Sequence, residues 1–149
     1  MDSQEIIHGA ALEIFGYGVV IVGTSGSGKS ELLLRLMDRG HKFIADDHVL
    51  IQEQNNTLWI YQHSAKFIHL GGIGFVDVLE TYSQEAVANL AIQCNLFIEL
   101  ENNQLNYTNR IAELSTHMNI LQHKLPLAKL YIAQNRPLEL LVEILVKKQ

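Results

Sequence analysis

An eight-residue stretch near the start of the chain has the pattern of a phosphate-binding loop. Residues 23–30 satisfy G-x-x-x-x-G-K-[ST]. Glycines let such a loop point its backbone N–H groups at phosphate oxygens, and the start of the following helix adds partial positive charge. A lysine can reach the outer phosphates, and a serine hydroxyl can take one coordination site on Mg²⁺. We therefore predict phosphate-binding roles for the whole loop, which consists of Gly23, Thr24, Ser25, Gly26, Ser27, Gly28, Lys29 and Ser30.

Two adjacent carboxylates, Asp46 and Asp47, follow the apolar run Phe-Ile-Ala. Neighbouring side chains of a strand point to opposite faces, but a turn at the strand end can bring both to one site. Phosphoryl transfer needs a carboxylate near Mg²⁺ and a group that accepts the proton of the attacking hydroxyl. The pair could divide these roles. The alternative, on spacing alone, is a turn in which one aspartate accepts a backbone N–H.

The elements on either side of the loop fit a phosphate site better than a Gly/Ser-rich turn. Residues 18–22 are wholly apolar after their first glycine, which is typical of a strand covered on both faces. Residues 30–39 are predicted to form a helix. Its buried stripe consists of Leu32, Leu33 and Leu36.

The rest of the chain is predicted to interleave strands and helices. Strands are expected at 6–15, 42–52, 57–62, 95–100 and 127–133, with a turn at the two aspartates within 42–52 and strand ends around a glycine loop at 67–78. A short helix capped by Ser83 and a final amphipathic helix over 136–148 are also expected. The polar, poorly periodic segment 101–124 is predicted to be a loop with one helical turn. Interleaving of this kind indicates the α/β class, and short strands joined by tight turns indicate a mixed sheet.

Composition sets further bounds on the 149-residue chain, for which we predict a single domain over residues 1–149. The formal net charge of -5 disfavours a sequence-independent nucleic-acid binder, because such proteins need an excess of Lys and Arg. The acidic first residues and the lack of an apolar run of ~18 residues indicate neither a secretory signal nor a membrane span. The one cysteine, Cys94, lies in an apolar strand and fits a reducing compartment. We therefore expect a cytoplasmic protein that binds neither nucleic acid nor membrane.

At this point the sequence resembles a known family, the C-terminal catalytic domain of HPr kinase/phosphorylase. The family pattern contains His-Gly, two strands, the phosphate loop followed by Glu, a helix ending in Arg-Gly-His, and Ala-Asp-Asp-x-Val. The matching residues here lie within 8–51 and are His8-Gly9, GTSGSGKSE, Arg39-Gly40-His41 and Ala45-Asp46-Asp47-His48-Val49. Weaker similarity covers 72–78 and the tail from Leu127 onward.

The resemblance implies a P-loop kinase fold like that of phosphoenolpyruvate carboxykinase. The implied donor is ATP or pyrophosphate, the metal is Mg²⁺, and the acceptor is a serine of the phosphocarrier protein HPr or a paralogue, with phosphorolysis as the reverse reaction. It also implies a short form without the family's N-terminal domain, and a homo-oligomer, which in the family is a hexamer. Carried over by motif, Asp46 or Asp47 is the base, Ser30 and Asp47 bind the metal, His8 lines the phosphate site and Arg136 lies near the acceptor.

Two positions depart from the family pattern. The family has Glu-[IV]-Arg-Gly-[LI]-Gly where this chain has His69 and Gly71 in place of Glu and Arg. A neutral imidazole is a poor ligand for Mg²⁺, which prefers oxygen. Losing both groups would cost on the order of 10² to 10⁴ in rate.

The alternative function is thus a catalytically weakened nucleotide-binding regulatory module of a phosphotransferase system. A small-molecule kinase ranks lower, because 101–124 offers only Arg110 and Lys124 as lid cations.

Overall fold

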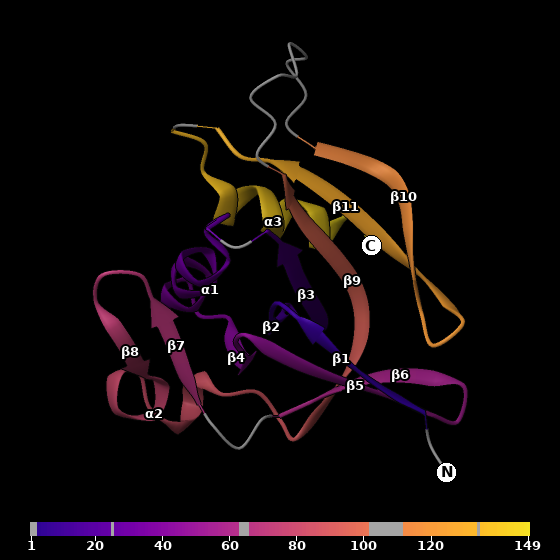
Figure 1. Cartoon of the computed structure of the whole chain (residues 1–149), viewed down its shortest axis with the longest axis horizontal. Coiled ribbons are helices and arrows are strands. Elements are labelled where there is room, and N and C mark those ends of the chain that lie inside the picture. Colours follow the sequence, from indigo (N-terminus) through magenta and orange to yellow (C-terminus); the bar gives the residue numbers. More distant parts are fainter. Residues whose placement is uncertain (1–2, 25, 63–65, 102–111, 134) are drawn as a thin grey trace.

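A mixed sheet carries the elements of the candidate site (Figure 1). The structure is a computed structural model and describes residues 3–24, 26–62, 66–101, 112–133 and 135–149. Within these residues, the nine strands of the main sheet are β1 (Gln4–His8), β2 (Ala10–Ile14), β3 (Tyr17–Gly23), β4 (Lys42–Ala45), β5 (His48–Gln54), β6 (Thr57–Tyr61), β9 (Ala91–Glu101), β10 (Ala112–Ile120) and β11 (His123–Tyr131). A separate hairpin consists of β7 (Phe67–Leu70) and β8 (Gly74–Asp77).

The long strand β9 is the centre of the sheet. It pairs in parallel with β3 and with β11, and in antiparallel with β6. The main path runs β1-β5-β6-β9-β3-β2-β4, and β10 pairs with β11. The predicted mixed sheet is confirmed. Because β3 is buried along most of its length, its apolar sequence places Gly23 and the phosphate loop at the end of a rigid strand.

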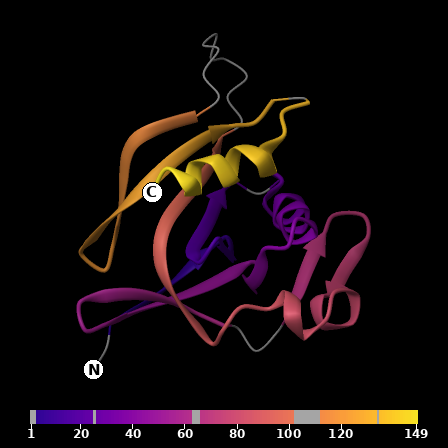
Figure 2. The ribbon, with the colours of Figure 1, turned by 180° about the vertical axis from the view of Figure 1, so that it is seen from behind.

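Helices cover one face of the sheet (Figure 2). α1 (Lys29–Asp38) and α3 (Leu138–Lys147) pack against the side of β3 that presents Val19 and Ile21. The predicted stripe of α1 is confirmed, since its three leucines are buried. The other side of β3 presents Val20 and Val22 to a second apolar core beneath β5 and β6. The two cores follow from the two-residue period of the strand.

A buried polar cluster joins the end of α1 to α3. The Glu143 carboxylate accepts hydrogen bonds from Arg39 Nε at 2.9 Å and Nη2 at 2.6 Å, and it contacts His41 Nε2 at 2.6 Å. The pKa of Glu143 falls to about 2, chiefly because Arg39 donates to the carboxylate. Arg39 and His41 are two residues of the Arg-Gly-His motif, which therefore fastens the last helix to the first.

Three predicted elements differ in the structure. The strand predicted at 6–15 is two strands, β1 and β2, which a bend at Gly9 separates. A Cβ at Gly9 would lie 2.5 Å from the Ile21 carbonyl oxygen, so glycine is required there. In the segment predicted to be a loop, residues 112–120 form β10 and the next strand begins at His123; residues 102–111 lie outside the described residues. The remaining short elements are α2 (Val78–Thr81) and the 3₁₀ turn η1 (Gln84–Ala86).

The helix predicted after Ser83 is therefore reduced to one 3₁₀ turn, and Ser83 makes no capping hydrogen bond. The capping aspartate is Asp77, whose side chain accepts from the Glu80 N–H and starts α2. Cys94 is buried as predicted, and burial raises the pKa of its thiol to about 12. In the part of the chain that the structure describes, no helix combines the length and apolarity that crossing a membrane requires.

Candidate functional site

The phosphate loop leaves β3 and enters α1 through glycines in left-handed conformations. Gly26 has φ 82° and Gly28 has φ 92°, values that side chains with a Cβ rarely adopt. Both glycines line the site cavity described below. Ser25, between them and the strand, lies outside the described residues.

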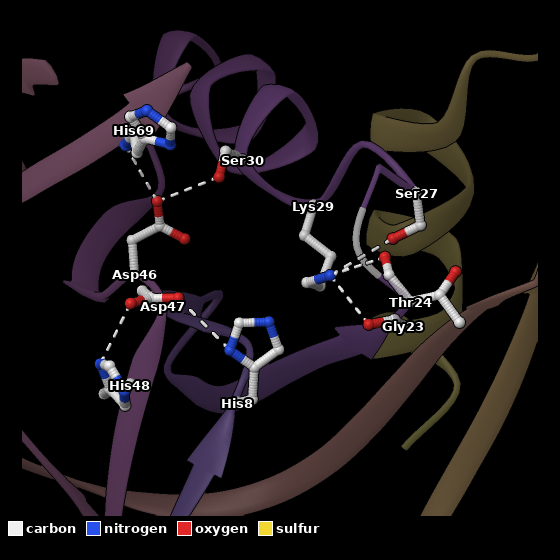
Figure 3. A network of polar contacts seen from close by, with 10 residues as sticks. All are labelled: His8, Gly23, Thr24, Ser27, Lys29, Ser30, Asp46, Asp47, His48 and His69. Carbon is white, nitrogen blue, oxygen red and sulfur yellow. Dashed lines mark hydrogen bonds and ion pairs between the residues drawn. The ribbon is translucent and has the colours of Figure 1, made fainter. Parts of the chain in front are cut away.

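Lys29 lies over the opening of this loop (Figure 3). Its ammonium donates to the carbonyl oxygens of Gly23 at 2.8 Å and Thr24 at 2.9 Å. A further contact joins it to Ser27 Oγ at 3.4 Å. The charge of Lys29 is therefore held at the strand end of the loop.

The aspartate pair forms the turn between β4 and β5. Asp47 has φ 71°, and the His48 N–H donates to the Asp46 carbonyl at 2.8 Å across it. The Gly9 N–H donates to the Asp47 carbonyl at 3.1 Å. This turn is the one that the sequence required if both side chains were to reach one site. It also places the end of β1, with His8, beside Asp47.

Asp46 faces the start of α1. Its Oδ2 accepts from Ser30 Oγ at 3.0 Å and from the His69 backbone N–H at 3.3 Å. Burial raises the pKa of Asp46, and the two hydrogen bonds partly oppose this effect. A carboxylate so placed is a favourable neighbour for a cation.

Asp47 faces the opposite way, between two imidazoles. His8 Nδ1 lies 3.3 Å from one carboxylate oxygen and His48 Nδ1 lies 3.1 Å from the other (Figure 3). The Asp47 side chain is 60% exposed. It is thus oriented by two partners and still open to a substrate.

One cavity of about 630 Å³ unites these groups. Its lining includes the second half of the loop, both aspartates and three imidazoles, namely Gly26, Gly28, Lys29, Ser30, Glu31, Asp46, Asp47, His8, His48 and His69, with Phe67, Leu70, Gly71 and Phe75 from the β7–β8 hairpin. A second cavity of about 680 Å³ lies on the other side of His8. It is lined by Ile7, His8, Val22, Gly23, Thr24, Glu99, Leu100, Glu101 and Met118.

The oxygen donors beside Ser30 suit Mg²⁺. The Ser30 hydroxyl and the Asp46 carboxylate lie 3.0 Å apart, and Mg²⁺ in phosphate sites commonly takes one or two such ligands together with waters and phosphate oxygens. Among the described residues, no group of three or more His, Cys, Asp or Glu side chains could hold a metal by itself. The carboxylate that contacts Ser30 is Asp46, whereas the sequence reading named Asp47 as the metal ligand.

Arg136 is a predicted site residue that does not join the others at the site cavity. It lies between β11 and α3, and its Nη1 donates to the Tyr131 carbonyl at 2.7 Å. It does not line either of the two cavities described above. Asp77, a carboxylate on the same hairpin as His69, caps α2 and does not line either cavity.

Sequence reasoning missed His48, the backbone N–H of His69, and the rings of Phe67 and Phe75. His48 occupies the variable position of Ala-Asp-Asp-x-Val, so the motif carried no signal for it. The rings of Phe67 and Phe75, in contrast, did carry a signal in the sequence. In a hairpin, Phe67, His69 and Phe75 share one face by the two-residue period.

Comparisons with known proteins agree with this geometry. A family model for the HPr Serine kinase C-terminal domain matches residues 1–149. The HPr kinase/phosphorylase of Streptococcus gordonii is 33% identical over 144 residues, which are 92% of this chain and 45% of that protein. The HPr kinase/phosphorylase of a Thermoanaerobacter species is 33% identical over 148 residues, or 95% of this chain and 47% of that protein. The chain thus spans about half the length of these curated relatives.

A solved structure extends the likeness to three dimensions. The structure of the Hpr(Ser) kinase/phosphatase from Coxiella burnetii matches with a TM-score of 0.84 and 30% sequence identity. The match covers 97% of this chain and 89% of that chain, and it confirms the α/β kinase fold expected from the resemblance. This chain therefore belongs to the family of HPr serine kinase C-terminal domains.

Proposed function

We propose that the chain transfers a phosphoryl group from ATP, or from pyrophosphate, to a serine of HPr or a paralogous phosphocarrier, and removes it by phosphorolysis. The observation that carries this proposal is the single cavity that Lys29, Ser30 and both aspartates line together. Family membership supports the reaction class.

The loop would hold the donor. Its backbone N–H groups and the Lys29 ammonium would face the phosphates, and they would stabilise the charge that spreads over the transferred group. When bound through Ser30 and Asp46, Mg²⁺ would neutralise phosphate oxygens in the same place. The hydrogen bond between Ser30 and Asp46 supports this pairing.

Asp47 would act as the base. It would accept the proton of the serine hydroxyl as that oxygen bonds to phosphorus and the bond to the leaving ADP oxygen breaks. His8 and His48 would hold the carboxylate in place through its two oxygens. In the reverse direction orthophosphate attacks the phosphorus of phosphoserine and the bond to the serine oxygen breaks. Protonated Asp47 returns the proton to that oxygen, and pyrophosphate is the product.

The test measures transfer of label from [γ-³²P]ATP to purified HPr and its paralogues. The wild-type chain should label a phosphocarrier, and Asp47→Asn should lower the rate by at least about 10²-fold while Mg-ATP still binds. Lys29→Ala should lose ATP binding because the loop loses its cation.

The matched control is Glu5→Gln, which makes the same carboxylate-to-amide change at an exposed position of β1 that does not line the site cavity. It should transfer phosphate at the wild-type rate. A wild-type chain that binds Mg-ATP yet labels none of the phosphocarriers would overturn the proposed function.

A further inference from the structure

The β7–β8 hairpin carries an exposed apolar surface beside the site cavity. The hairpin stands outside the main sheet, next to α1 (Figure 1). Phe67, Ile73 and Phe75 are 47%, 78% and 74% exposed. Ile68, on the opposite face of β7, is fully buried, and Val76, which is paired with it, also packs against the core. One face thus anchors the hairpin, while the other face and the tip leave apolar side chains uncovered.

The hairpin is hydrogen-bonded to the carboxylate beside Ser30. The His69 N–H donates to Asp46 Oδ2 at 3.3 Å, and the same oxygen accepts from Ser30 Oγ at 3.0 Å (Figure 3). All the apolar side chains that line this cavity belong to the hairpin, namely Phe67, Leu70 and Phe75. The rest of the lining consists of glycines and of polar or charged residues. The apolar part of the cavity therefore adjoins the carboxylate that would bind Mg²⁺.

The proposed transfer brings a protein serine to this part of the site. Its hydroxyl must come within hydrogen-bond reach of Asp47, whose side chain is 60% exposed. A cavity of about 630 Å³ has the size of a small-molecule site, so only the serine-bearing segment of a folded phosphocarrier can enter it. Specific protein interfaces bury about 800 Å² on each partner. The phosphocarrier must therefore also contact the surface around the opening.

The polar side chains of the lining already have partners or roles in the reaction. Lys29 and Ser30 would hold the donor and the metal, and the imidazoles of His8 and His48 contact the Asp47 carboxylate. The cores of protein interfaces are depleted in charged residues and enriched in aromatic ones. Of the surfaces that border the cavity, the hairpin is the one with this composition.

We infer that the β7–β8 hairpin is the docking surface for the acceptor protein, with Ile73 and Phe75 as its principal contacts. The inference rests on the proposed function, because a phosphocarrier is the acceptor only if that function holds. It adds the chemistry of the partner, which must present an apolar patch next to its acceptor serine. Exposed apolar side chains that gather beside a polar site are typical of protein interaction surfaces.

Ile73→Ser tests the inference most directly, because Ile73 belongs to the hairpin and does not line either cavity. Label transfer from [γ-³²P]ATP is measured against the concentration of the phosphocarrier that the wild-type chain labels, HPr or a paralogue, and separately against that of Mg-ATP. Ile73→Ser should raise the KM for the phosphocarrier by about 5-fold or more, as truncation of a central interface residue does. The KM for Mg-ATP and the kcat at saturating phosphocarrier should stay within about twofold of wild type.

Phe75→Ala should raise the KM for the phosphocarrier by about 10-fold or more, because aromatic residues contribute strongly to interface affinity. Phe75→Leu keeps an apolar side chain at this position and should restore most of the lost affinity. Calorimetric titration of the phosphocarrier into each variant should give the same order of affinities without depending on turnover.

Leu90→Ser is the matched control for Ile73→Ser, since Leu90 is 75% exposed and lies outside the hairpin and both cavities. It should leave both KM values unchanged. The inference is wrong if Ile73→Ser and Phe75→Ala bind the phosphocarrier as wild type does, or if Ile73→Ser raises the KM for Mg-ATP by the same factor. It is wrong also if Ile73→Ser only separates an oligomer in light scattering, because the hairpin then joins copies of this chain. A wild-type chain that binds Mg-ATP and labels no phosphocarrier would instead refute the proposed function.

Discussion

Asp47 reaches the cavity through one unusual backbone conformation. Its φ of 71° lies in the left-handed region, which costs a residue with a side chain on the order of 1–3 kcal/mol. Two backbone hydrogen bonds, from Gly9 to Asp47 and from His48 to Asp46, stabilise the turn. The turn separates the two carboxylates, so that Asp46 lies by Ser30 and Asp47 lies between two imidazoles. Different roles for two adjacent aspartates follow from this separation.

A second prediction concerns His69 and Gly71, which stand where the family pattern has Glu and Arg. The double variant His69→Glu/Gly71→Arg should raise the rate of phosphate transfer by about 10-fold or more, because it adds an oxygen ligand and a cation to the cavity. The fold should accept it, since a Cβ at Gly71 meets no atom within 4 Å and the His69 side chain is exposed. Single-turnover transfer to the phosphocarrier measures the effect.

His117→Glu serves as the control for the glutamate of the double variant, because it makes the same His-to-Glu change at an exposed position of β10 that does not line the cavity. An unchanged rate in the double variant would mean that the residues already present supply what the family obtains from its Glu and Arg.

Among the elements, the break between β1 and β2 matters most for the site. Gly9 lets the backbone pass against β3, and its N–H holds the Asp47 turn. Gly9→Ala should destabilise the fold by about 1–3 kcal/mol, as overpacking does, and should also lower transfer because His8 and Asp47 move apart. Urea unfolding and the transfer assay measure the two effects.

The matched control for Gly9→Ala is Gly71→Ala, where the added methyl group meets open space. Its stability should stay close to that of wild type. If both variants unfold at the same urea concentration, close packing at Gly9 is not what fixes the break.

Some of these elements could be predicted from the sequence alone and others could not. The loop, α1 and the aspartate turn were predictable because each has a local cause: positive-φ glycines, a leucine stripe, a strand that ends in turn residues. β10 was not predicted, because its pattern is weak. Over 116–120 only Met118 and Ile120 alternate with exposed neighbours, and the strand exists because β11 pairs with it. Likewise, no local pattern indicates that Phe75, 45 residues after Ser30 in the sequence, lines the same cavity as the loop.

Over the whole molecule, the cavity depends on contacts that join distant parts of the chain. The phosphate loop leads into α1, and α1 is fastened at its other end to α3 by the cluster of Arg39, His41 and Glu143. Residues 104 positions apart thus restrain the helix whose first turn carries Lys29 and Ser30. The Arg-Gly-His motif at 39–41 thus holds α3 against the end of α1 and does not line either cavity.

This cluster should make global stability depend on pH in a defined direction. The pKa of Glu143 is lowered from 4.5 to about 2 by the Arg39 hydrogen bonds. Its stabilisation is therefore complete above pH 4.5 and lost as the pH falls toward 2. Glu143→Gln removes the charge that Arg39 donates to, and it should lower the free energy of unfolding at pH 7. The difference in unfolding free energy between this variant and wild type should shrink steadily below pH 4.5.

Urea titrations from pH 7 to pH 3 measure this difference, with Glu5→Gln as the exposed control. A difference that stays constant over this range would show that the carboxylate charge does not hold α3 in place.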